Sequence, residues 1–225
     1  MPELISGVLL MPPVEAFLES LEICTRRKIL ISLKKTAQNY WGNWFHLLND
    51  TDELYELVCE HEGKYYRLFG FFVNTTMDRI LVVVWYGNVK GLKKAALSEV
   101  ERAEEKKHRL LKESVLNDNA FLIEKMSKSL SQIEDQMIGL SETPERKQYE
   151  FELMVDILAC RLKKYRLDNV MTHDELSLLL GIKKNQLLKL EKGDTTITFS
   201  TLMKVMKSLP DSSINETQDV IFKET

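Results

Sequence analysis

Residues 172–193 read THDELSLLLGIKKNQLLKLEKG, and this stretch decides how the C-terminal part of the chain folds. Thr172 and Glu175 have the spacing of a capping box, which starts a helix. Gly181 permits the tight turn that ends this helix, and a second helix is predicted over residues 183–191. The apolar residues expected to face inward are Leu176, Leu179, Leu180, Ile182, Leu187 and Leu190. The pattern therefore predicts two short helices packed around one turn.

Two helices joined by a short glycine-containing turn form the helix-turn-helix plan, in which the second helix enters the major groove of DNA. The stretch resembles the helix-turn-helix of the phage-repressor (XRE) class. That resemblance implies double-stranded operator DNA as a partner and a homodimer formed through this half. The side chains predicted to contact DNA are Lys183, Lys184, Asn185, Gln186 and Lys189. The alternative is a helical hairpin with ordinary surface lysines.

The distribution of charge agrees with a DNA-binding C-terminal half. The whole chain has 31 Lys and Arg against 34 Asp and Glu, a net charge of −3 that indicates no nucleic-acid partner. Residues 153–209, however, hold 10 basic and 6 acidic side chains, whereas residues 113–152 hold 4 and 9. Positive charge therefore collects where a phosphate backbone would attract it.

Composition places the chain among ordinary globular proteins, with 225 residues, 44% hydrophobic and 29% charged, enough for two domains. Its longest strongly apolar run, Ile80–Tyr86, is too short to span a membrane, and the N-terminus does not read as a signal peptide. We therefore expect a cytoplasmic protein without a membrane partner. Cys24, Cys59 and Cys160 lack metal-ligand spacing, so we expect reduced, buried thiols, no metal and no cofactor.

The N-terminal half has the pattern of a compact α+β domain. The predicted elements are a strand at 4–11, a helix beginning at the Pro12-Pro13 pair, a helix at 25–40, strands at 53–60, 64–73 and 79–86, and a charged helix from Ser98. The second helix carries a basic cluster of Arg26, Arg27, Lys28, Lys34 and Lys35. This cluster forms either a solvated helix face or a face that contacts RNA.

The order of these elements and several phrases resemble the HigB-type toxins of the RelE superfamily over residues 4–112. The phrases are FLESL from Phe17, ELYEL from Glu53, YRLF from Tyr66, the strand ending at Gly87, and LSEVERAEE from Leu97. The resemblance implies a small α/β fold and a ribosome-dependent endoribonuclease that cuts mRNA without a metal. It assigns catalytic roles to Arg67, Lys90 and Lys94, which would hold the phosphate and stabilise developing charge.

The same comparison shows departures at the site of this chemistry. Where the family carries a second lysine, threonines and a proline after the strand, this chain has Gly91, Leu92, Ala95 and Ala96. Val58 replaces an arginine. The loss of these charges and hydroxyl groups predicts a nuclease with reduced activity. The alternative is that Arg67 and the loop lysines are surface charges without a catalytic role.

The phrase TPERKQYEFEL, followed by the helix-turn-helix, resembles HigA-type antitoxins over residues 126–209. Two departures occur, His173 in place of a phosphate-contacting glutamine and Leu188 in place of a small polar residue. The predicted organisation is a toxin-like domain at 1–112, an acidic helical linker at 113–152, an all-α XRE-type domain at 153–209 and a polar tail at 210–225. The linker either only connects the domains or covers the basic toxin loop as a strap.

We therefore expect a fused toxin–antitoxin protein, whose DNA-binding half neutralises the toxin half and represses its own promoter. One alternative is a DNA-binding transcriptional regulator whose toxin-like half is an inactive partner-binding module. The other is an active endoribonuclease whose helix-turn-helix serves only inhibition and dimerisation.

Overall fold

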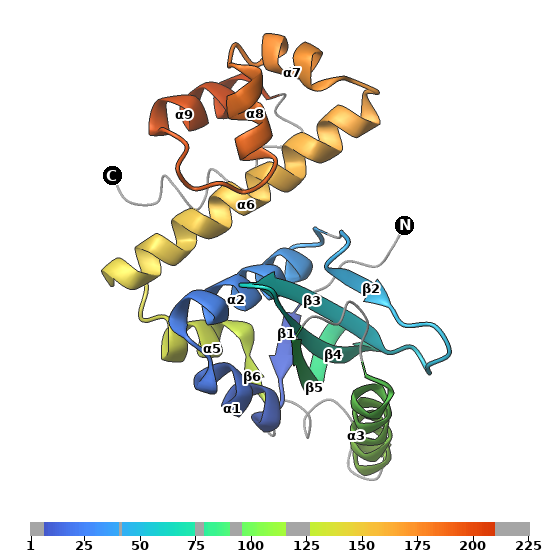
Figure 1. Ribbon diagram of the computed structural model, residues 1–225. Helices are drawn as coiled ribbons and strands as arrows, with labels where there is room; N and C mark the ends of the chain where they lie inside the picture. Colours follow the sequence, from blue (N-terminus) through green and yellow to red (C-terminus); the bar gives the residue numbers. More distant parts are fainter. Residues whose placement is uncertain (1–6, 41, 75–78, 91–95, 116–126, 210–225) are drawn as a thin grey trace. The chain divides into compact units, whose positions relative to one another are not determined.

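The chain folds as two compact units, Met1–Tyr149 and Glu150–Thr225. The computed structural model describes residues 7–40, 42–74, 79–90, 96–115 and 127–209 (Figure 1). Within these ranges the first unit is α+β and the second is entirely helical, as the sequence predicts.

The first unit is built on a six-stranded sheet of order β2-β3-β4-β5-β1-β6. Its strands are β1 Gly7–Leu10, β2 Phe45–Leu47, β3 Tyr55–His61, β4 Lys64–Asn74, β5 Arg79–Lys90 and β6 Lys128–Ser129. β3, β4 and β5 are antiparallel neighbours, and β1 lies parallel to β5 with Gly7 opposite Ile80. The three long strands confirm the prediction. β2 and β6 are not predicted from the sequence, because they are too short to show an alternating pattern.

Helices cover both faces of this sheet, because the central strand is apolar throughout. The covering helices are α1 Pro12–Ser20, α2 Ile23–Ala37 and α3 Leu97–Val115. Phe17 of α1 stacks on Tyr86 of β5, with 4.1 Å between the ring centroids. Leu110 of α3 packs with Phe71 and Val82. α3 therefore lies across the sheet from α1 and α2 (Figure 1).

The described part of the predicted linker belongs to the first unit. β6 pairs antiparallel with β1, and α5 (Leu130–Met137) follows directly, started by a Ser129–Gln132 capping box. α6 (Pro144–Asp168) begins at the proline where a helix start was predicted. Since the division between units falls after Tyr149, residues 127–149 form part of the sheet unit's structure.

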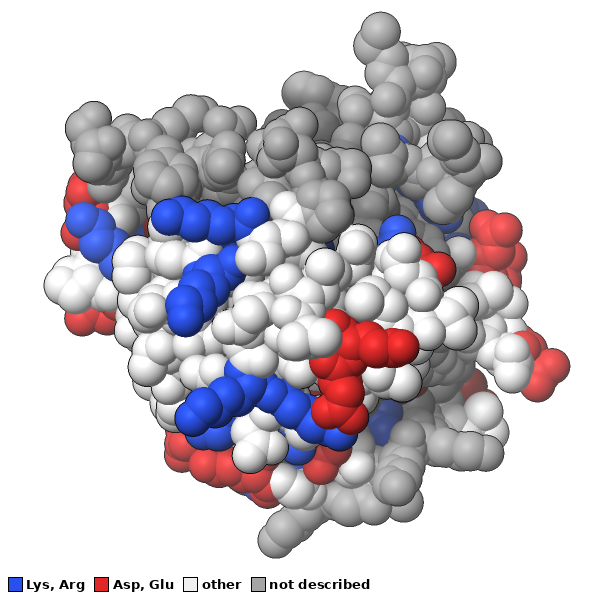
Figure 2. Space-filling model, turned by 90° about the horizontal axis from the view of Figure 1, so that it is seen from above, with Lys and Arg blue, Asp and Glu red and all other residues white. Residues whose placement is uncertain are grey.

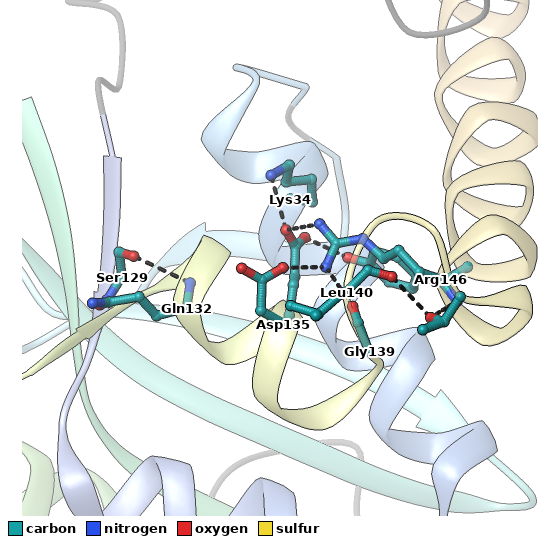
Figure 3. A network of polar contacts seen from close by, with 10 residues as sticks. Lys34, Ser129, Gln132, Asp135, Gly139, Leu140 and Arg146 are labelled. Atoms are coloured by element: carbon teal, nitrogen blue, oxygen red, sulfur yellow. Dashed lines mark hydrogen bonds and ion pairs between the residues drawn. The ribbon is translucent and has the colours of Figure 1, made fainter. Parts of the chain in front are cut away.

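A buried carboxylate ties this segment to the rest of the first unit (Figure 3). Glu134 of α5 has a side chain only 1% exposed and accepts from Lys34 Nζ at 3.1 Å and Arg146 Nη2 at 3.2 Å. The hydroxyl of Tyr149 donates to its other oxygen at 2.7 Å. The described acidic segment thus uses Glu134 to bind α2 and the start of α6. Residues 116–126 and Lys94 lie outside the described residues, so the strap over Arg67, Lys90 and Lys94 stays a prediction.

The basic cluster on α2 is also largely structural. Arg26 donates to the carbonyl oxygens of Leu18 and Glu19, both at 2.8 Å. Lys35 is only 7% exposed, and its ammonium lies 4.3 Å from the ring centroid of Trp44. Together with the Lys34–Glu134 pair, these contacts show that three of the five basic residues are used within the fold, whereas Lys28 is exposed. Contact of this face with RNA stays a prediction.

The second unit packs four helices around one apolar core. The helices are the C-terminal part of α6, α7 His173–Leu179, α8 Lys184–Leu190 and α9 Phe199–Ser208. The core includes Val155, Leu158, Leu162, Leu176, Leu180, Leu187, Leu190, Leu202 and Val205. The inward positions predicted for α7 and α8 are confirmed except for Leu179, which is 50% exposed. Leu178 is 84% exposed as well, so two leucines of this apolar run lie outside the core.

The thiols and the polar clusters of the described residues give little indication of a chemical function. All three cysteines are thiols: Cys59 is buried, Cys160 is half-buried and Cys24 is exposed, so the expected burial is wrong for Cys24. In the described ranges, no three His, Cys, Asp or Glu side chains are placed to hold a metal ion. No helix in those ranges is long and apolar enough to cross a membrane.

Candidate nucleic-acid interface

Local helix caps and apolar residues that pack in the core determine the conformation of the helix-turn-helix in the second unit. Thr172 Oγ1 accepts from the backbone N–H of Glu175 at 3.2 Å, and the Thr172 N–H donates to the Glu175 carboxylate at 2.7 Å. Gly181 has a φ of +62°, which favours glycine and turns the chain sharply. Ile182 then packs on the core, as predicted, and Leu187 anchors α8. The other side of α8 is left outside the core.

A charge cluster holds the start of α7 next to the end of α8. Glu191, 8% exposed, accepts from Arg166 Nε at 2.8 Å and Nη2 at 3.0 Å. The Nε2 atom of His173 lies 3.2 Å from the same carboxylate. Burial alone would raise the pKa of Glu191, but the hydrogen bond and charge of Arg166, and then His173, hold it below its usual range. The His173 ring, 33% exposed, is therefore fixed in place at the solvent boundary.

The five side chains predicted to contact DNA lie together, on α8 and at the residue before it. They differ in whether other groups of the protein bind them. Lys183 and Asn185 are exposed, and their side chains form no hydrogen bond or ion pair with another side chain among the described residues. Lys184 Nζ is 2.7 Å from Asp174 Oδ2 of α7, with both side chains at least half exposed. Lys189 Nζ is 4.0 Å from Asp194 Oδ2.

Gln186 is used within the fold. Its Oε1 accepts from the backbone N–H of Lys183 at 3.0 Å. Its Nε2 donates to Thr201 Oγ1 of α9, also at 3.0 Å. Gln186 is half-buried, so it joins the start of α8 to α9. Leu188, the other departure from the expected pattern, is half-buried as well.

Two of the exposed lysines on α8 have acidic partners that are not predicted from the sequence. Asp174 and Asp194 each face a lysine of α8 and reduce the net positive charge on the exposed side of this helix. Figure 2 agrees with this mixed character, since its lysine and arginine side chains lie in separate groups, some beside acidic side chains. Asp174 lies two positions after the cap residue Thr172, in the first turn of α7, where an acidic residue is favourable in any helix. No local pattern therefore indicates its ion pair with Lys184.

The residues predicted for nuclease chemistry do not form an open cluster in the described part of the chain. Arg67 is 0% exposed, and its Nε lies 2.7 Å from Glu56 Oε1. His46 Nε2 lies 3.1 Å from the other oxygen of Glu56. Burial raises the pKa of Glu56, and this effect is larger than the lowering caused by Arg67 and His46. Lys90 ends β5 opposite Lys64, with its side chain outside the described atoms. Lys94 lies outside the described residues.

Comparison with known proteins identifies the second unit. A family model described as helix-turn-helix, the XRE type, matches residues 162–216. No curated protein and no solved structure matches the chain. The chain thus carries an XRE-type helix-turn-helix, a class of DNA-binding domain, and the turn between α7 and α8 lies inside the matched range.

Proposed function

We propose that this protein is a transcriptional regulator that binds operator DNA as a homodimer through its helix-turn-helix unit. The observation that carries the proposal is the position of α8. Leu187 and Leu190 fix one side of the helix in the core, while Lys183, Lys184, Asn185 and Lys189 remain exposed on the outside. A helix anchored in this way can place its first residues against base edges in the major groove.

In this proposal the first unit binds a partner and does not cut RNA. Stabilising charge on a phosphate requires donors that converge on it from a solvent-accessible position. Arg67 instead faces a buried carboxylate, and Val58, where the toxin pattern has an arginine, lies opposite Arg67 in the sheet register. These two positions remove positive charge from the place where the resemblance would put the chemistry.

The fused toxin–antitoxin protein is the second candidate function. Its support is the order β1, α1, α2, β3, β4, β5, α3 in the first unit, which follows the order expected for a small RelE-like toxin fold. In that function the first unit would act on mRNA at the ribosome and the helix-turn-helix would neutralise it. Both candidates place the protein in the cytoplasm with DNA as a partner.

A gel-shift titration tests the DNA-binding proposal. The full chain is titrated onto the DNA upstream of its own gene at several salt concentrations, beside Lys183→Ala and, as a matched control, Lys207→Ala on α9. We expect specific binding that weakens with salt, with a salt slope reduced by about one for Lys183→Ala only. Binding no tighter than to unrelated DNA would contradict the proposal.

Mapping mRNA ends separates the two candidate functions. The full chain is made in a translating extract, beside the Arg67→Ala variant, and the 5′ ends of the mRNA are determined. A regulator leaves the messages intact. New ends that disappear with Arg67→Ala would support the toxin–antitoxin function and exclude an inactive first unit.

A further inference from the structure

We propose that Asn185 is the base-reading amide of α8 and that it specifies an adenine in each half-site, whereas the neighbouring Gln186 is a positioning residue. This inference rests on the proposed function, since it names what the DNA-binding surface reads. Asparagine and glutamine share the amide that pairs with the N6 and N7 atoms of adenine in the major groove. The sequence places both at the start of α8 and does not distinguish between them.

The contacts of Gln186 direct its amide into the protein. A bidentate contact with adenine needs the carbonyl oxygen and the amino group of one amide to point together at the base edge. In Gln186 the oxygen accepts from Lys183 N–H at 3.0 Å and the amino group donates to Thr201 Oγ1 at 3.0 Å. Turning this amide toward DNA would break both of these hydrogen bonds.

The second partner of Gln186 is itself built into the fold. Thr201 is 5% exposed, and its hydroxyl lies 2.9 Å from that of Thr198, whose side chain caps α9. Leaving buried polar groups unsatisfied is unfavourable. Gln186 therefore holds α8 against the capped start of α9, and its contacts set the position from which α8 meets DNA.

Asn185 has the opposite properties. It is exposed, and its amide makes no hydrogen bond in the described part of the chain. It is the second residue of α8, in the part of a recognition helix that contacts base edges. Its neighbour Lys184 is drawn toward α7 by Asp174, at 2.7 Å. Asn185 is thus the amide on this surface whose two hydrogen-bonding groups are both available to a base.

The test is selection from a randomised double-stranded DNA library by the full chain, followed by affinity measurements on the selected site. Asn185→Ala and Gln186→Ala are selected in parallel, and thermal unfolding is recorded for each. For the wild-type chain we expect a preferred adenine in each half-site, with about 5- to 150-fold weaker binding when it is replaced. Asn185→Ala should lose this preference at that position alone and keep the wild-type melting temperature.

Gln186→Ala should behave differently. It should melt at a lower temperature and bind every sequence more weakly, with the adenine preference retained in what binds. A selected site whose base preferences are unchanged by Asn185→Ala overturns the inference and leaves the proposed function standing. So does a loss of the adenine preference in Gln186→Ala at an unchanged melting temperature. A wild-type chain that selects no sequence overturns both.

Discussion

Lys184 and Asp174 face each other across the turn of the helix-turn-helix, with 2.7 Å between Nζ and Oδ2. The pair joins α7 to α8 on the surface that we propose meets DNA. A phosphate would compete with Asp174 for the same ammonium group. The ion pair therefore lowers the charge available for DNA binding while adding little to folding, because both side chains are at least half exposed.

Asp174→Asn should strengthen DNA binding. Because an exposed ion pair has a modest free energy, the gain should be about 1.5- to 5-fold at low salt and should shrink as salt screens the charges. Gel shift at two salt concentrations measures this effect. Asp168→Asn, an exposed acid at the end of α6, is the control and should change affinity little. Equal effects of the two variants would show that only overall charge matters.

Glu191→Gln should destabilise the helix-turn-helix unit in a pH-dependent way. At neutral pH the loss of the Arg166 and His173 contacts should lower the free energy of unfolding by about 1.5–3 kcal/mol. The pKa of Glu191 is lower in the folded chain than its usual 4.5, so the unfolded state binds more protons in acid. The stability from Glu191 is thus present in full above pH 4.5 and is lost as the pH falls through the lowered pKa.

Denaturant unfolding followed by circular dichroism at pH 7 and in acid measures this difference. The gap between wild type and Glu191→Gln should narrow in acid, because protonation of Glu191 removes the same interactions as the substitution. Asp168→Asn serves again as the exposed control. A gap that stays constant between the two pH values would mean that Arg166 is held by something other than the ionised carboxylate.

Glu134→Gln should destabilise the first unit strongly. The change leaves Lys34 and Arg146 without a buried counter-charge, a loss of about 3–5 kcal/mol. All three tryptophans of the chain lie before Tyr149, so tryptophan fluorescence during urea unfolding reports on this unit. Glu142→Gln removes an exposed pair with Lys147 in the same segment and should have a much smaller effect. A comparable loss in the free energy of unfolding for both variants would show that the burial of Glu134 does not determine its contribution to stability.

Arg67 and Glu56 should be coupled in a double-mutant cycle. Arg67→Met alone leaves the Glu56 carboxylate buried without its guanidinium and should cost about 3–5 kcal/mol. Adding Glu56→Leu should restore much of this stability, because an apolar pair of similar size replaces a buried ion pair. The measurement is again urea unfolding by tryptophan fluorescence. An Arg67→Met variant with unchanged stability would show that the guanidinium has no structural role.

The sequence by itself determined the elements whose signals are local. The cap of α7, the turn at Gly181 and the inward positions of Leu187 and Leu190 depend on residues within a few positions of each other. Helical spacing and backbone preference therefore suffice to predict them. The long antiparallel strands were predictable for the same reason, because each is a long run of apolar residues bounded by turn residues.

Only the tertiary structure decided what the polar side chains do. Lys34 and Glu134 are 100 residues apart in the chain, and Gln186 and Thr201 are 15 apart, so no local pattern relates them. Arg67 has the residue type expected at a phosphate site, yet its strand places it against buried Glu56. A charged or amide side chain can meet solvent, DNA or another side chain, and the packing of distant elements selects among these partners.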